Sequence, residues 1–315
     1  RAAGMATAAG GIRSTEVDDI HLGSCTTPTS VAMPAALLIG AQPSPEAAED
    51  AIRIGVELMV RLGLAIHGPE VLYKGVWPTC FSTPLGVAAV AARLWGLGEE
   101  ATVNALSMAL MVSSGRTGRF NGTPTGRWVL LRCAVQNGLR AAHAARKGYK
   151  GDSSLLDGEW LKNAQGLDAD LSLLTSGFDA SLSLPGLGAK PFSTARQALS
   201  ATQALIALLN EGLAVERIKS IRVFVPPAYQ RMISQPIDRN SRSSGYVSAP
   251  FQMALAALRP EGLWDLDRSR VMQDDALYAF AARISVDADP ELQKAYPARW
   301  QARIEVETDA GMMTR

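Results

Sequence analysis

The chain contains few of the residues that build metal centres and disulfide frameworks. Its 315 residues include only three cysteines and three histidines. Cys25, Cys80 and Cys133 lie far apart and form no CxxC pair, so we expect neither a disulfide framework nor a zinc site, and a reducing cytosol is the simplest compartment. We therefore predict a cytoplasmic protein without metal or organic cofactor, in which the three thiols are small buried hydrophobic groups.

Long apolar runs and an excess of charge of one sign are also absent. No hydrophobic segment reaches the ~18–20 residues that a membrane span needs, and the opening residues show no apolar region of the signal-peptide type. Lysine and arginine number 31 against 30 aspartates and glutamates, whereas a nucleic-acid binder usually has a basic excess. We expect neither a membrane nor a nucleic acid as a partner.

Apolar residues are plentiful, and their spacing changes along the chain. They make up 47% of the sequence, against 19% charged residues, which is enough for a sizeable core and argues against global disorder. In the first half, apolar positions recur at helical spacing. Helices are predicted over residues 46–64, 86–97, 100–113 and 127–147, and a further apolar helix is expected to start near Pro34.

After about residue 185, helical segments alternate with segments rich in β-branched residues. Helices are predicted over 194–210 and 246–258, and strands over 218–225, 283–287 and 302–308. We therefore predict a mainly α protein with two domains. Residues 1–185 form a large all-helical domain without any sheet, and residues 186–315 form a smaller α+β domain in which strands 218–225 and 302–308 pair.

The segment Glu16–Pro28 concentrates acid–base groups ahead of an apolar helix. Glu16, Asp18, Asp19 and His21 lie within six residues. Crowded carboxylates raise one another's pKa, and a nearby histidine can share the proton, which suits general acid–base catalysis. We expect a carboxylate of this segment to orient the ring of His21 and to raise its pKa. The alternative is an ordinary helix-capping loop, in which Asp and Ser are common.

Three further stretches contain groups that bind carboxylates. Val76–Gly86 offers hydroxyls and amides at a helix start, although a proline-punctuated turn with a packed Trp has the same composition. Gly115–Trp128 contains three arginines whose planar forks match carboxylates, and the alternative is a mobile surface loop. Lys190–Gln197 lies at the predicted domain junction, where small-molecule clefts often form, and the alternative is an ordinary hinge.

Several common catalytic motifs are missing. The chain has no P-loop, no GxGxxG after a strand and no GxSxG elbow, so nucleotide binding and a serine-hydrolase mechanism have no support. His67 and His143 stand in a loop and in an alanine-rich helical segment, and we assign neither a role.

Taken in order, the four polar stretches resemble the MmgE/PrpD family, which includes 2-methylcitrate dehydratase, cis-aconitate decarboxylase and iminodisuccinate epimerase. Glu16-Val-Asp-Asp-Ile-His21 resembles the family's acidic DxDD segment, and Trp77-Pro-Thr79 resembles its His-Pro-Thr stretch before a small-residue helix. Arg132–Leu139 resembles G-x-A-A-x-N-G, and Lys190-Pro-Phe192 resembles K-P-Y-P. The resemblance runs along nearly the whole chain.

The resemblance implies a helical domain, a smaller α+β lid and a site between them, with further helices before residue 1 and after residue 315. This sequence also departs from the family pattern. Thr27, Trp77 and Leu199 stand where dehydratase and decarboxylase members carry histidines, and Arg127 stands where the family has lysine. Arginine does not readily exchange a proton, but it can hold a carboxylate. The departures favour the epimerase-like branch.

We therefore predict a cofactor-independent enzyme that removes a proton α to a carboxylate of a small di- or tricarboxylate, as an epimerase, isomerase or dehydratase, and that forms a homodimer. The alternatives are a 2-methylcitrate dehydratase-like hydro-lyase and a non-catalytic carboxylate-binding relative. The predicted catalytic residues are Asp18, Asp19, His21 and Lys190. The predicted substrate-binding residues are Glu16, Thr27, Trp77, Thr79, Arg116, Arg119, Arg127, Arg196 and Gln197.

Overall fold

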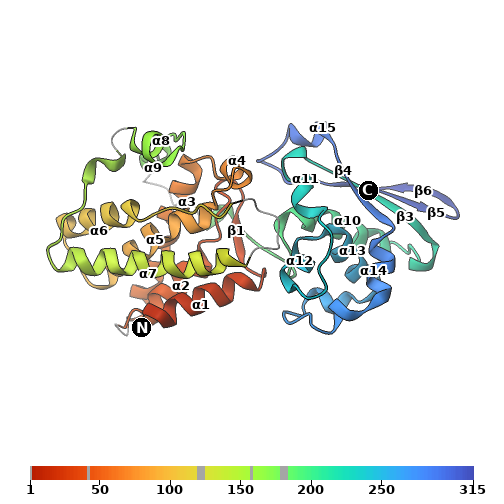
Figure 1. Ribbon diagram of the computed structural model, residues 1–315, viewed down its shortest axis with the longest axis horizontal. Helices are drawn as coiled ribbons and strands as arrows, with labels where there is room; N and C mark the ends of the chain where they lie inside the picture. Colours follow the sequence, from red (N-terminus) through yellow and green to blue (C-terminus); the bar gives the residue numbers. More distant parts are fainter. Residues whose placement is uncertain (1, 41–42, 119–124, 157–158, 178–183) are drawn as a thin grey trace. The chain divides into compact units, whose positions relative to one another are not determined.

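The computed structural model describes residues 2–40, 43–118, 125–156, 159–177 and 184–315. Their contacts divide the chain into two compact units: the first runs to Ala189, and the second contains Thr125 and the residues from Lys190 onwards. Helices dominate the fold (Figure 1), so the prediction of a mainly α protein is confirmed. None of the helices in the described ranges combines the length and hydrophobicity that crossing a membrane requires.

The helices of the first unit gather around α5. Contacts join α5 to α2, α3, α4, α6 and α7, and every residue of α5 from Pro78 to Ala92 is buried. The helices of this unit are α1 (Ala2–Ser14), α2 (Thr29–Leu38), α3 (Pro45–Ala65), α4 (Gly68–Tyr73), α5 (Pro78–Leu94), α6 (Glu99–Met111), α7 (Gly126–Arg146), α8 (Trp160–Gln165) and α9 (Ser172–Thr175).

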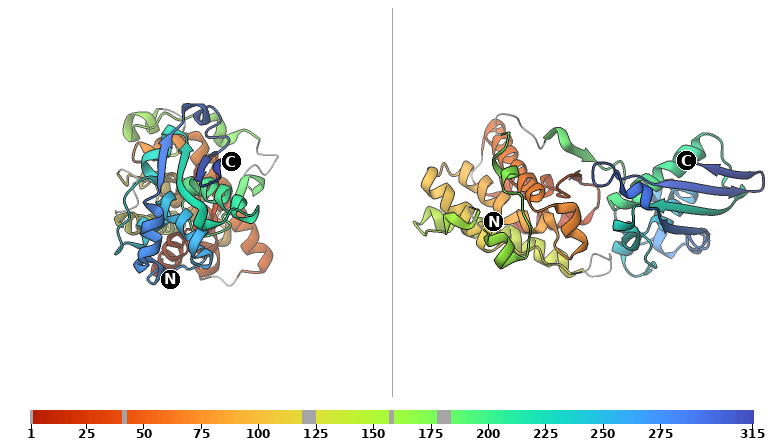
Figure 2. Two further views of the ribbon diagram at one scale, coloured as in Figure 1. Left: turned by 90° about the vertical axis from the view of Figure 1, so that its right-hand side faces the viewer. Right: turned by 90° about the horizontal axis from the view of Figure 1, so that it is seen from above.

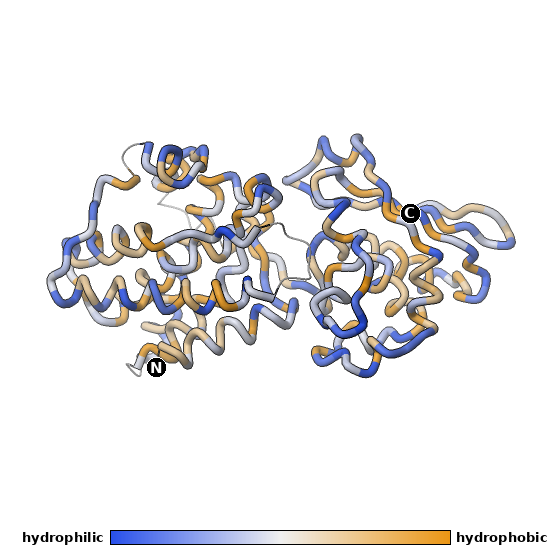
Figure 3. The backbone as a smooth tube through the Cα atoms, viewed as in Figure 1, coloured by the Kyte–Doolittle hydropathy of each residue, from blue (hydrophilic) through white to orange (hydrophobic). Residues whose placement is uncertain are grey.

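Glycines allow the neighbours of α5 to pack against its backbone. A Cβ added at Gly55 of α3 would lie 3.2 Å from the carbonyl oxygen of Gly86, and one added at Gly138 of α7 would lie 2.4 Å from that of Pro84. Any side chain at Gly138 would force the helices apart. Hydrophobic and hydrophilic residues alternate along α7 (Figure 3), as expected for a helix with one buried face.

Helix α5 begins eight residues earlier than the predicted start at Gly86, and the expected turn at Val76–Gly86 is mostly helix. Pro78 occupies the first helical position, where no N–H is required. Pro84 lies inside the helix and lacks an N–H donor. The hydroxyls of Ser82 and Thr83 donate to the carbonyls of Pro78 and Thr79 within the same turn.

The prediction that residues 1–185 contain no sheet is wrong. Strand β1 (Asp19–His21) pairs antiparallel with β2 (Leu187–Ala189), with Asp19 opposite Ala189 and His21 opposite Leu187. A three-residue strand is too short to show alternating hydrophobicity, so its pairing with a distant segment leaves no local signal. The pairing fixes the backbone of the acidic segment within the first unit.

The second unit contains a mixed sheet with strand order β4-β3-β5-β6. Strands β3 (Ile218–Val225) and β5 (Arg303–Thr308) pair antiparallel, which confirms the predicted pairing, and β4 (Ile284–Ala288) runs parallel to β3. Figure 2 shows the long strands side by side. The sequence analysis did not predict β6 (Gly311–Thr314), which pairs with β5.

The helices of the second unit are α10 (Arg196–Asn210), α11 (Pro227–Ile233), α12 (Arg242–Val247), α13 (Ala249–Leu258), α14 (Asp275–Ala281) and α15 (Pro290–Gln293). The predicted helix over 246–258 is interrupted at Ser248, which has an extended backbone and accepts a hydrogen bond from the Phe251 amide. Pro250 has no N–H to donate to the Tyr246 carbonyl, as a continuous helix would require, and Ser248 caps the helix that follows.

Candidate acid–base site

A buried arginine neutralises two carboxylates of the acidic segment. Arg13, in the last turn of α1, places Nη1 2.9 Å from Glu16 Oε1 and Nε 3.1 Å from Asp18 Oδ2. All three side chains are buried. Burial opposes the charge of Arg13, but the attraction of Asp18 and Glu16 outweighs it and raises the pKa of the guanidinium. Of the three predicted carboxylates, Glu16 and Asp18 therefore form ion pairs.

Two tryptophans enclose this ion-pair cluster. The rings of Trp77 and Trp128 meet edge to face with centroids 5.8 Å apart. The Arg13 guanidinium carbon lies 5.4 Å from the Trp77 centroid and 5.7 Å from that of Trp128. Arg127, at the start of α7, lies 4.6 Å from the Trp128 ring. Cation–π contacts of this kind gain strength when they are shielded from water.

The charge of Arg127 is destabilised by its surroundings. Its side chain is buried, and this burial lowers the pKa of the guanidinium to about 10, while Glu16 opposes the shift and Arg13 adds to it. At about 1.4 kcal/mol per pKa unit, a fall from 12.5 to about 10 means that roughly 3 kcal/mol opposes the charge. A carboxylate that binds beside Arg127 would offset this cost.

Asp19, the third carboxyl group of the segment, is held by Thr29. It accepts hydrogen bonds from the Thr29 hydroxyl and, at 3.3 Å, from the Thr29 amide at the start of α2. Burial raises the pKa of Asp19 and the charge of Asp18 raises it further, although the Thr29 hydrogen bonds act in the opposite direction. Asp19 thus holds a proton more readily than an exposed aspartate does.

His21 is oriented by Ser24 and not, as we predicted, by a carboxylate. Its Nδ1 accepts a hydrogen bond of 3.1 Å from the Ser24 amide and lies 3.0 Å from the Ser24 hydroxyl. The neutral ring therefore carries its proton on Nε2. The expected rise of its pKa is also wrong, because burial lowers the pKa and the charge of Glu57 opposes this only in part.

The hydroxyls of Thr27 and Thr79 meet at the N-terminus of α5. Their Oγ1 atoms lie 3.2 Å apart, and the Thr27 amide donates to Thr79 Oγ1 over 3.1 Å. The loop before Thr27 lies directly on the end of α3. A Cβ at Gly63 or Gly68 would lie 2.9 Å or 1.9 Å from the Ser24 carbonyl oxygen, so both positions require glycine for this approach.

The structure brings most of the predicted residues of the first unit together. Arg13 joins Glu16, Asp18 and Trp77, and Arg127 lies against Trp128, which meets Trp77 edge to face. Thr27 meets Thr79, while Asp19 and His21 are held by Thr29 and Ser24. Arg116 points elsewhere: it is exposed, donates to the Gln165 carbonyl and lines a separate pocket of about 660 Å³ with His67. Arg119 lies outside the described residues.

The remaining predicted residues belong to the second unit. Lys190 and Gln197 are buried there, and Arg196 begins α10. Burial lowers the pKa of Arg196, and nearby Tyr229 opposes the shift. Their participation in a site stays a prediction. No group of His, Cys, Asp and Glu side chains in the described part of the chain has a metal-binding arrangement.

The sequence analysis missed Arg13, which organises the cluster, and Ser24 and Thr29, which position the two titratable groups. The three-residue spacing of Arg13 and Glu16 indicated only that the two are near in the chain, because α1 ends at Ser14 and Glu16 lies beyond it with a left-handed backbone (φ 55°). For the contacts of Ser24 and Thr29, the sequence offered no signal beyond the place of both residues near the polar segment.

Comparison with protein families gives a match over nearly the whole chain. Residues 1–170 match the MmgE/PrpD N-terminal domain, and residues 192–315 match the MmgE/PrpD C-terminal domain. A search of curated proteins gives no match. The family is generally enzymatic, and the match supports a role of lyase, dehydratase or epimerase type in general terms.

Proposed function

The chain belongs to the MmgE/PrpD family, and we propose that it removes a proton α to a carboxylate of a small di- or tricarboxylate without a cofactor. The observation that carries this proposal is the state of Asp19. Its neighbours Glu16 and Asp18 are paired with Arg13, whereas Asp19 accepts hydrogen bonds from Thr29 and has a raised pKa. A carboxyl group tuned in this direction suits general acid–base catalysis.

In this proposal Asp19 is the base. His21 is a weaker candidate, because its Nδ1 lone pair accepts from the Ser24 amide and its Nε2 already carries the proton. With that proton, the neutral ring suits a donor to the carbanion or to a leaving hydroxyl. Asp18, which is ion-paired to Arg13, supports Asp19 through its charge. Lys190 remains a predicted proton donor or acceptor in the second unit.

Substrate binding is assigned to Arg127, Thr27 and Thr79. An α-proton of a carboxylate is weakly acidic, so negative charge develops on the substrate and must be stabilised by prearranged donors. The buried guanidinium of Arg127 supplies a planar fork for a carboxylate. Thr79 lies in the first turn of α5, where unpaired amides and the helix dipole favour anions.

Epimerisation or isomerisation is proposed ahead of dehydration. Dehydration requires an acid that protonates the leaving hydroxyl. This chain has Thr27 and Trp77 where the resemblance places histidines in dehydratase members of the MmgE/PrpD family. A 2-methylcitrate dehydratase-like hydro-lyase is the alternative, with His21 as the acid. Homodimer formation and a cytoplasmic location stay predictions.

A non-catalytic carboxylate-binding protein is a second candidate. It is favoured by the ion pairs of Arg13, which occupy two of the three carboxylates. Proton NMR in deuterium oxide separates the two candidates. The protein is incubated with a panel of di- and tricarboxylates, including succinate, malate and citrate. Loss of an α-proton signal supports the enzyme, whereas binding without exchange for any member of the panel favours the carboxylate-binding protein.

A further inference from the structure

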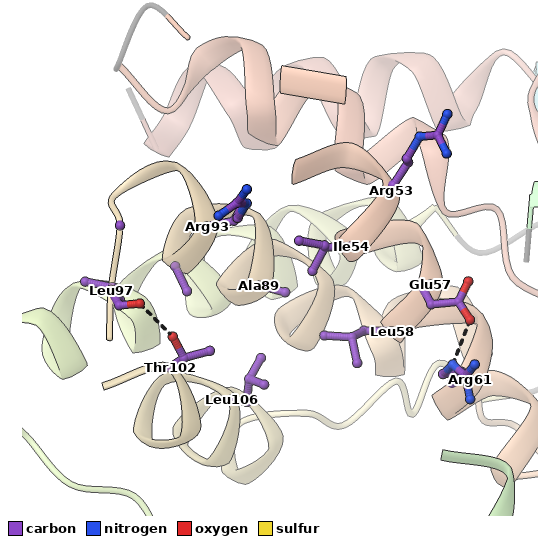
Figure 4. A pocket seen from close by; sticks show the side chains of 12 residues that line it. Arg53, Ile54, Glu57, Leu58, Arg61, Ala89, Arg93, Leu97, Thr102 and Leu106 are labelled. Atoms are coloured by element: carbon purple, nitrogen blue, oxygen red, sulfur yellow. Dashed lines mark hydrogen bonds and ion pairs between the residues drawn. The ribbon is translucent and has the colours of Figure 1, made fainter. Parts of the chain in front are cut away.

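A second cavity of the first unit includes none of the predicted site residues. It has a volume of about 540 Å³ and is lined from α3, α5, the turn after α5, and α6. Ile54 and Leu58 of α3, Ala89 of α5 and Leu106 of α6 converge in its middle (Figure 4). Pockets of this size and apolar character hold small molecules in many proteins.

A smaller pocket lies beside this cavity. It has a volume of about 240 Å³, shares Leu58 and Leu106 with the cavity and adds Leu110, Leu155 and Leu174. We call the two neighbouring pockets together the apolar groove. An apolar cavity of about 150 Å³ already holds one benzene ring, so this groove has room for an extended alkyl chain.

The charged groups of the cavity favour an anion. Its lining contains three arginines, Arg53, Arg61 and Arg93, and one carboxylate, Glu57. Arg61 is 1% exposed, pairs with Glu57 at 2.7 Å and donates to the Ser176 carbonyl at 2.7 Å. It therefore forms part of the wall and is not the group that would receive a ligand.

Arg53 and Arg93 are exposed, and each pairs with an exposed carboxylate, Glu49 and Asp50 respectively. Exposed ion pairs contribute only about 0–1 kcal/mol. Such pairs rearrange at little cost when another carboxylate approaches. The groove thus combines an apolar channel with two cationic side chains that can share an incoming anion.

We propose that this groove binds a fatty carboxylate, with the alkyl chain along Ile54, Leu58 and Leu106 and the carboxylate between Arg53 and Arg93. The site is separate from the proposed acid–base site and does not depend on the proposed reaction. An extended chain is favoured over a compact ligand because Leu58 and Leu106 belong to the walls of both neighbouring pockets. An anion is favoured because Arg53 and Arg93 line the cavity in exposed ion pairs, in which a ligand carboxylate can replace the present partner.

The test is calorimetric titration of the full chain with octanoate, decanoate and dodecanoate below their critical micelle concentrations. Affinity should rise about fourfold for each added methylene until the groove is filled. Decanol and decyltrimethylammonium have the same chain length as decanoate without its charge, and both should bind more weakly than decanoate. Equal affinity for the three ten-carbon probes would overturn the proposal, as would no binding.

Variants locate the binding. Arg53→Gln and Arg93→Gln should each weaken the affinity for decanoate by about two- to fivefold, which is the size of an exposed charge contact. Both should leave the affinity for decanol unchanged. Ile54→Trp, checked for folding by circular dichroism, should abolish binding of both. Arg140→Gln on α7 is the matched control, because Arg140 does not line either pocket. Unchanged decanoate affinity in all three test variants would show that the site is elsewhere.

A second copy of the chain is the competing occupant. If the groove is a docking surface, sedimentation should show a dimer that Ile54→Trp dissociates and that decanoate does not affect. That result, together with the absence of carboxylate binding, would overturn the proposal. Dissociation of such a dimer by decanoate at the concentrations that saturate the wild-type titration would support it.

Discussion

The side-chain oxygens of Thr27 and Thr79 lie 3.2 Å apart, although 52 residues separate them in the sequence. Thr27 follows the acidic segment, and Thr79 lies in the first turn of α5. This contact joins two of the proposed substrate-binding residues and holds the chain that follows the acidic segment against the start of α5. Because both side chains are buried, removing the Thr79 hydroxyl would take this partner from both the amide and the hydroxyl of Thr27, and a buried polar group left unsatisfied costs about 1–3 kcal/mol.

Arg127 should be required for substrate binding. Arg127→Ala is expected to weaken the binding of a di- or tricarboxylate from the exchange panel by about 2–5 kcal/mol, because a desolvated charge pair is lost. The dissociation constant is measured by calorimetry on the ligand that the NMR panel identifies. Arg116→Ala is the control, since Arg116 is exposed and contacts Gln165. Equal losses in both variants would contradict the assignment.

Asp19 should be required for proton exchange. Asp19→Asn keeps the size of the side chain and an acceptor for the Thr29 hydroxyl, but it removes the base. We expect the rate of α-proton exchange in deuterium oxide to fall by about 10²–10⁴-fold. His21→Gln is compared in the same assay. It is expected to lower the turnover rate, because it removes the proposed proton donor. Wild-type exchange in both variants would place the base elsewhere, with Lys190 as the next candidate.

Arg13 should be important for stability. Arg13→Ala leaves Glu16 and Asp18 buried without their cation, and breaking a buried pair in this way costs about 3–5 kcal/mol. The free energy of unfolding is measured by urea denaturation. Arg217→Ala, which removes an exposed pair with Asp309, should cost less than about 1 kcal/mol. The prediction is wrong if the two variants are equally stable.

His21 should make the protein less stable in mild acid. Burial lowers the pKa of the folded imidazole below its ordinary 6.5. Between these two pKa values the unfolded chain binds more protons, so the free energy of unfolding decreases as the pH falls from about 6.5 through the folded pKa. His21→Gln should remove this part of the pH dependence, whereas the exposed His143→Gln should leave it intact. A wild-type pH profile in His21→Gln would rule out this contribution.

The sequence predicted the long elements and missed the short ones, for physical reasons that particular residues illustrate. The amphipathic pattern over 46–64 gave α3 (Pro45–Ala65) to within a residue at each end, because that helix buries one continuous face. Strand β1 carries no such pattern, since it has only three residues, and its partner β2 lies far along the chain. Pro78 and Pro84 indicated a loop, but both lie in α5, where tertiary packing outweighs local propensity.

The candidate site was predicted from residue types and not from their pairing. Clustered carboxylates in Glu16–His21 indicated acid–base chemistry, but only the fold shows that Arg13 pairs with Glu16 and Asp18 and leaves Asp19 for a different role. Pairing of this kind depends on the direction in which α1 enters the acidic segment, and no sequence spacing encodes it.

The balance of charges around Arg13 couples ligand binding to the buffer. The guanidiniums of Arg13 and Arg127 and the carboxylates of Glu16 and Asp18 cancel when all are ionised. A dianion that enters this neutral cluster brings negative charge that the cluster does not match. The added negative charge raises the pKa of Asp19 further, which makes its ionised form a stronger base and lets part of the protein population take up a proton. Binding would therefore draw protons from solution, and the observed heat of binding would change with the ionisation enthalpy of the buffer.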